Sequence, residues 1–273
     1  MGTIEIERGM VKYITSDGEI YYVKQHFPPS IPPVTERTSQ KLLVPERFFS
    51  YGPIEKIVSL LGLGRCNVVT VKLAHEMHLT FEEFEMLQEM VGPEFYFSRA
   101  AYQYTPDTLP HKDPETAMGY QIVLDILVRN WDDGDRNMYM VSGIPVWFDF
   151  GASLDPRCQN VYRFLLKLQD AAEAGRVSSI ELYFKNYSRQ REKILEAAIE
   201  VFESITQSEI RTIVQVSEDE FSGFFADYLV NNISQISEDV DIIRGAFLSQ
   251  KTADKGRIFY EPILKQTFWR QIK

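Results

Sequence analysis

The sequence predicts an α+β chain with a strand-rich first hundred residues, a central loop and hairpin, and a helical last third. Three observations predict this order. Apolar and polar residues alternate near the start, apolar residues recur at helical spacing beyond Pro156, and no internal repeat interrupts the chain.

The composition narrows the class of protein. The chain has 273 residues, 44% hydrophobic and 25% charged, which is ordinary for a globular protein and sufficient for a large core. The net charge of -10 disfavours nucleic acid and anionic lipid as partners. With two cysteines, Cys66 and Cys158, and no signal peptide or membrane span evident, we expect a cytoplasmic protein.

The first element is a predicted β-hairpin. Strands over Met10–Ile14 and Ile20–Lys24 flank a turn at Ser16–Gly18. The four prolines within Pro28–Pro33 predict an extended loop after it.

Helices and strands then alternate up to residue 104. We expect a helix over Tyr51–Leu61, ended by Gly62, and a Val-rich strand over Cys66–Leu73. A capping box at Thr80–Glu83 opens a second helix. The aromatic run Phe95–Tyr104 is typical of a further strand.

A third helix leads into the centre of the chain. Asp113 followed by Pro114 is a helix-start signal, and the helical apolar spacing continues to Asn130. A polar loop, Trp131–Asn137, comes next.

A second hairpin, with strands over Met138–Val141 and Val146–Phe150, follows that loop. Beyond it the sequence predicts helices, with a capping box at Ser217–Glu220 and two apolar stripes: Ile194, Leu195, Ala198, Ile199 and Phe202 in one, and Phe221, Phe224, Phe225, Tyr228 and Leu229 in the other.

The polar loop and the second hairpin carry the residues that suggest chemistry. Phosphoryl transfer from ATP needs a carboxylate that accepts the proton of the attacking hydroxyl, and oxygen ligands that hold Mg²⁺. Asp132 is the candidate catalytic base. Asn137, five residues later, and Asp149, which opens an Asp-Phe-Gly run, have the order and spacing of the metal ligands in kinase-type sites.

The pattern Asn130-x-Asp132-x-x-x-Arg136-Asn137, followed by Trp147-x-Asp149-x-Gly151-Ala152-Ser153-Leu154, resembles the HipA-like kinase family. The similarity spans about residues 10 to 155. It implies a two-lobed, protein-kinase-like fold with ATP bound between a strand-rich N-lobe, residues 1–104, and a mostly helical C-lobe, residues 105–273. Kinases of this family commonly act on Ser or Thr.

A kinase site of this type needs a cation for the ATP phosphates, and Lys24 at the end of the first hairpin is the candidate. Its acidic partner is expected on the next helix, where Glu55 fits better than Glu46. Because no glycine-rich loop is evident, the turn with Ser16 and Gly18 is the candidate phosphate cover.

Adenine would contact the end of the aromatic strand, Arg99–Tyr104, with Tyr102 and Gln103 as candidate ATP-binding residues. The sequence therefore predicts a kinase that uses ATP and Mg²⁺, with a protein as the expected substrate. Two alternatives stay open: another transfer from the same nucleotide site, such as adenylylation or phosphorylation of a lipid or small molecule, and a pseudokinase that serves as a binding module.

Overall fold

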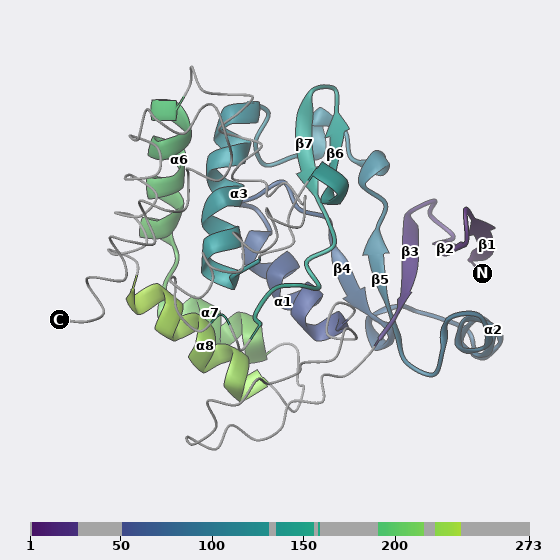
Figure 1. Cartoon of the computed structure of the whole chain (residues 1–273). Coiled ribbons are helices and arrows are strands. Elements are labelled where there is room, and N and C mark those ends of the chain that lie inside the picture. The colour runs from purple at the N-terminus through teal and green to yellow at the C-terminus, as the bar shows by residue number, and fades with distance from the viewer. Residues whose placement is uncertain are drawn as a thin grey trace, which may run out of the picture.

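The computed structural model describes residues 2–26, 51–130, 135–155, 158, 191–215 and 222–235. These residues form helices and antiparallel strands, as the sequence predicts. The helices are α1 (Gly52–Gly62), α2 (Phe81–Val91), α3 (Pro114–Val128), α6 (Arg191–Ser204), α7 (Gln207–Gln215) and α8 (Ser222–Ser234). In Figure 1 the larger sheet and α2 lie on one side, α3, α6, α7 and α8 lie on the other, and α1 lies between them.

The larger sheet has five antiparallel strands in the order β1-β2-β3-β5-β4. Their bounds are β1 (Thr3–Glu7), β2 (Met10–Ile14), β3 (Ile20–Gln25), β4 (Val71–Leu73) and β5 (Phe95–Arg99). The hairpin predicted around Ser16–Gly18 is confirmed as β2 and β3. Strand β1 and its two-residue turn to β2, at Arg8 and Gly9, were not predicted. Both turn residues have positive φ angles, as is common in the two-residue turns of β-hairpins.

Two predicted strands are shorter than expected. Of Cys66–Leu73, β4 contains only Val71–Leu73, because the preceding residues turn toward the second hairpin and Val69 N–H donates to the Trp147 carbonyl. Of Phe95–Tyr104, β5 ends at Arg99 and a 3₁₀ turn follows. Val and aromatic content predicted strand propensity but did not specify where pairing ends.

Alternation along β3 sends its side chains to two different surfaces. Tyr21 and Val23 are buried against Phe97 and the inner face of α2, where Leu87 is fully buried. The capping box predicted for α2 is confirmed: Thr80 and Glu83 each accept the other's backbone N–H. Lys24 lies on the opposite surface of the sheet, in register with Tyr96 of β5.

Helix α3 is the centre of the helical side. Asp113 caps its N-terminus by accepting the Thr116 N–H, as predicted, and the helix ends at Arg129, whose φ is 53°. The second hairpin consists of β6 (Met138–Val141) and β7 (Ile144–Trp147). Its Trp147 is buried in the same core as α1, α3 and α8.

The helical last third is confirmed where it is described. Ala198 of α6 and Phe225 and Leu229 of α8 are fully buried in the core of the helical side. The capping box expected at Ser217–Glu220 lies outside the described residues. Within the described part of the chain, none of the helices has both the length and the apolar character needed to cross a membrane.

Candidate functional site

The centre of the candidate site is an ion pair between β3 and α1. Lys24 Nζ lies 3.2 Å from Glu55 Oε1, and Tyr96 donates its hydroxyl to the same oxygen at 2.8 Å. Glu55 is completely buried. The structure therefore brings together the two residues that the sequence analysis paired across 31 positions.

Asp149 completes a three-residue cluster. It follows β7, and its Oδ1 lies 3.2 Å from the same Lys24 Nζ. Its backbone is left-handed, with φ of 65°, a conformation that costs a non-glycine residue about 1 kcal/mol or more. This strained backbone at a carboxylate beside a lysine is typical of a functional position.

Asn137 lies beside Asp149 because β6 and β7 form one hairpin. Its carbonyl accepts the Phe148 N–H at 2.9 Å, and its side-chain Nδ2 donates to the Asp149 carbonyl at 3.5 Å. Among the described residues, no three His, Cys, Asp or Glu side chains gather as a metal site. Asn137 and Asp149, the two candidate metal ligands from the sequence, thus lie next to each other.

Burial and neighbouring charges act in opposite directions on the pKa values of Lys24 and Glu55. Desolvation disfavours the charged form of Lys24, but the carboxylates of Glu55 and Asp149 outweigh it and raise the Lys24 pKa. Burial raises the Glu55 pKa despite the Lys24 ammonium, and burial and Glu55 together raise the Tyr96 pKa. Tyr96 therefore remains a neutral hydrogen-bond donor at physiological pH.

Lys24 and Asp149 open onto a cavity of about 590 Å³ between the sheet and the second hairpin. This volume is typical of sites that bind a small molecule or cofactor. Much of its lining is aromatic: Tyr22, Tyr102, Tyr139 and Phe148. The Asp149 side chain is 45% exposed, so its carboxylate is accessible to a ligand.

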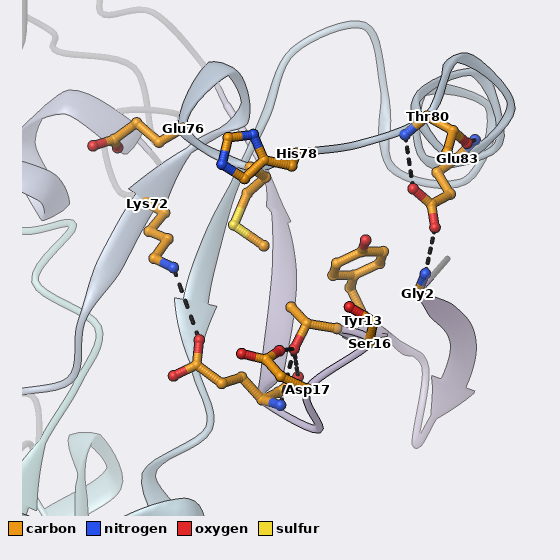
Figure 2. Close-up of a pocket in the computed structure, with 12 residues that line it drawn as sticks. Gly2, Tyr13, Ser16, Asp17, Lys72, Glu76, His78, Thr80 and Glu83 are labelled. Carbon is orange, nitrogen blue, oxygen red and sulfur yellow. Dashed lines mark hydrogen bonds and ion pairs between the residues drawn. The ribbon is translucent and has the colours of Figure 1, made fainter.

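The turn with Ser16 and Gly18 does not lie at this cavity. Strand register places it at the opposite end of β3 from Lys24. Figure 2 shows Ser16 and Asp17 at a different pocket, of about 340 Å³, together with His78. The expectation that this turn covers the phosphates is therefore corrected: the missed turn at Arg8 and Gly9 lies at the Lys24 end, and Gly9 lines the larger cavity.

Tyr102 and Gln103 follow β5 in a 3₁₀ turn, and only Tyr102 lines the larger cavity. The Tyr102 ring meets Tyr22 edge-on, with centroids 6.4 Å apart. Gln103 instead stabilises the neighbouring turn: its side chain accepts the Ile20 N–H and donates to the Gly18 carbonyl.

The predicted base, Asp132, lies outside the described residues. The segments on either side of its loop are described. Asn130 N–H donates to the Asp125 carbonyl at 2.9 Å at the end of α3. Asn137, on the other side of the loop, directly precedes β6 and contacts the Asp149 carbonyl.

Two residues of the site, Tyr96 and Gly9, carry little signal in the sequence. Tyr96 looked like any core aromatic, and its hydrogen bond to Glu55 depends on the pairing of β3 with β5. The turn at Gly9 is only weakly indicated by the sequence: an Arg-Gly pair between two stretches of alternating apolar and polar residues is compatible with a hairpin turn.

No protein-family model matches this sequence, and no curated protein matches it. Among solved structures, the chain is similar to the crystal structure of a Helicobacter pylori proinflammatory kinase, CtkA. The two share 13% sequence identity at a TM-score of 0.45, over 92% of this chain and 98% of that chain.

Proposed function

We propose that this protein is a kinase that transfers the γ-phosphoryl group of ATP, with Mg²⁺, to a hydroxyl group of a protein serine or threonine. The observation that carries the proposal is Lys24 held between Glu55 and Asp149 at 3.2 Å each, at the edge of a cavity of small-molecule size. In this proposal residues 1–104 and 105–273 are the two lobes of one protein-kinase-like domain.

Lys24 is the proposed phosphate-binding cation. The raised pKa of Lys24 keeps it charged, and a lysine held by a buried carboxylate also has a fixed direction, which a flexible surface lysine lacks. Glu55 binds the Lys24 ammonium, and the Tyr96 hydroxyl fixes the Glu55 oxygen that faces Lys24. Glu55 and Tyr96 together orient the Lys24 ammonium group toward the cavity.

Asp149 and Asn137 are the proposed Mg²⁺ ligands. Carboxylate and amide oxygens suit this ion, and the exposed Asp149 carboxylate leaves room for it. Two carboxylates face the one ammonium of Lys24, so a cation at Asp149 would also balance the local charge. When bound, Mg²⁺ would neutralise charge on the phosphates.

The turn at Arg8 and Gly9 is the proposed phosphate cover in place of the Ser16 turn. No heavy atom other than its chain neighbours lies within 4 Å of a Cβ placed on Gly9, so the turn is open on the side where a side chain would project. Tyr22 and Tyr102 offer aromatic surface for the adenine ring. Asp132 is the proposed base that accepts the proton of the acceptor hydroxyl.

One experiment tests the proposal. The purified protein is incubated with Mg²⁺ and ATP labelled at either the α- or the γ-phosphate, with casein as acceptor, and labelled protein is measured. We expect label from γ-labelled ATP only. Label from the α-phosphate would establish adenylylation instead. Absence of transfer together with retained ATP binding would identify a pseudokinase.

A further inference from the structure

Helix α1 carries Glu55, and the next residue, Lys56, holds the helix to the 3₁₀ turn that follows β4. Lys56 Nζ lies 2.8 Å from Glu76 Oε1, and Lys56 is buried. Glu76 ends the 3₁₀ turn after β4, where its second oxygen accepts the Leu73 N–H at 2.7 Å. Figure 2 shows the Glu76 carboxylate directed away from Lys72. The Glu76 side chain is thus fixed at one oxygen by the backbone and at the other by α1.

A second contact ties α1 to the same strand. Ser59, on the turn of α1 that follows Glu55, donates its hydroxyl to the Val69 carbonyl at 2.9 Å and accepts the Val71 N–H at 3.1 Å. These bonds fix the distance between the helix and β4. Ser59 therefore constrains the helix at one point on its surface, and the Lys56–Glu76 ion pair adds a second.

If α1 rotated about its own axis, Glu55 would move away from Lys24. Successive helical residues project about 100° apart, so Glu55 and Lys56 point toward different neighbours. With Glu55 bound to β3 and Lys56 bound to the turn after β4, rotation in either direction stretches one of the two ion pairs.

We infer that Lys56 and Glu76 are positioning residues, whose ion pair sets the rotation of α1 so that Glu55 meets Lys24. The inference rests on the proposed function for its catalytic consequence. Its structural part concerns only the Lys24–Glu55 contact and can be measured without activity.

The first test measures how far the ion pairs of Lys24 protect its amino group from chemical modification. Intact protein is treated with the N-hydroxysuccinimide ester of acetic acid, and acetylation of Lys24 is followed by mass spectrometry. In Lys56→Met and in Glu76→Gln, we expect Lys24 to react between about twofold and tenfold faster than in the unmodified chain. Lys112→Met is the matched control, because Lys112 forms an exposed ion pair of 3.0 Å with Asp107, away from α1.

Rescue separates positioning from general loss of stability. The exchanged pair Lys56→Glu with Glu76→Lys restores opposite charges at the same two positions but not the acceptor for the Leu73 N–H, so we expect Lys24 acetylation to return part of the way to the original rate. If Lys56→Met fails to fold, Glu76→Gln alone is tested, because glutamine has nearly the same size as glutamate. Unchanged Lys24 acetylation in a folded Glu76→Gln variant would overturn the inference.

The second test uses phosphoryl transfer. Lys56→Met should lower kcat/KM roughly tenfold to a hundredfold in the unmodified background, because small displacements at a reacting centre are costly. In a Glu55→Gln background it should have little further effect, since it acts through Glu55. Equal losses in both backgrounds would overturn the inference. Absence of transfer by the unmodified protein would overturn the proposed kinase function, while Lys24 acetylation would still decide the role of Lys56.

Discussion

Gly52 lies against the ring of Tyr96. A Cβ at Gly52 would stand 3.0 Å from ring carbons of Tyr96, closer than ordinary contacts allow. Tyr96 cannot move away freely because its hydroxyl is bonded to Glu55. The absence of a side chain at position 52 therefore lets α1 approach β5 closely enough for the buried hydrogen bond to form.

Gly52→Ala should therefore destabilise the protein by about 1–3 kcal/mol, since overpacking forces neighbouring atoms to shift. Gly223→Ala is the control. Gly223 also lies in the first turn of a helix, but nothing lies within 4 Å of its added Cβ, so alanine there should be neutral or stabilise by up to about 1 kcal/mol. Denaturant unfolding measures both. Equal effects of the two substitutions would contradict a specific contact with Tyr96.

Lys24→Met should reduce kcat/KM for ATP by roughly a hundredfold, because it removes the cation proposed to bind the phosphates. Lys12→Met is a matched control: Lys12 also faces two carboxylates, Glu5 at 3.3 Å and Glu7 at 3.7 Å, but on β2 and outside the cavity lining. We expect little change for Lys12→Met in nucleotide titration and turnover. Similar losses at both positions would remove Lys24 from the site.

Mg²⁺ and ATP together should raise the melting temperature. A ligand that binds only the folded protein at a hundredfold excess over its Kd stabilises it by about 2.7 kcal/mol. Asn137→Ala and Asp149→Ala should lose most of the Mg²⁺-dependent part and keep the part due to adenine. Thermal melts with ATP alone and with both ligands measure this. If Mg²⁺ adds nothing in the unmodified protein, the metal assignment fails and the nucleotide site can still stand.

The N-terminal cap of α3 predicts a pH dependence of stability. Partial burial opposes ionisation of Asp113, but Lys193 and the Thr116 donors outweigh it and lower the Asp113 pKa. A group whose pKa is lowered on folding stabilises the protein above its unfolded pKa, near 4, and loses this contribution as the pH falls further. Asp113→Ala should cost about 0.5–2 kcal/mol at pH 7, with the difference from the unmodified chain shrinking below pH 4. Urea unfolding from pH 7 to pH 2 measures it.

Site residues could be predicted from the sequence where the chemistry of the expected site allows few residue types. Lys24, Glu55 and Asp149 could be selected because a phosphate site needs a cation, its carboxylate partner and a metal ligand in that chain order, and the structure brings the three together. The turn with Ser16 was selected because no glycine-rich loop is evident and this turn precedes the strand that carries Lys24. The alternating pattern of the first strands could not show which of two turns lies at the Lys24 end, since that depends on strand register.

The position of Tyr96 was equally inaccessible from sequence. Its aromatic ring fits a core strand, and only the pairing of β3 with β5 places its hydroxyl on Glu55. The same holds for Lys56 and Glu76, whose ion pair joins a helix to a turn 20 residues away. Charged residues of this kind occur on many exposed helix faces, so their burial could not be inferred from their type.

The last prediction concerns Asp132 and the backbone that frames its loop. Leu154 N–H donates to the Val128 carbonyl at 2.7 Å, joining the segment after Asp149 to the end of α3. Arg129 and Leu154 at this junction both have positive φ, of 53° and 56°. The start of the loop and the Asp149 segment are therefore held to each other by backbone.

Asp132→Ala should leave ATP affinity nearly unchanged, because the proposed phosphate cation, Lys24, is held by Glu55 and Asp149. Turnover should fall by roughly 10²–10⁴-fold, the usual contribution of a general base. Equilibrium nucleotide binding and γ-phosphoryl transfer, measured on the same preparation, separate the two effects. Asp135→Ala is the control, and it should retain most of the activity. If Asp132→Ala keeps full turnover and Asp135→Ala loses it, the base lies three residues further along the loop.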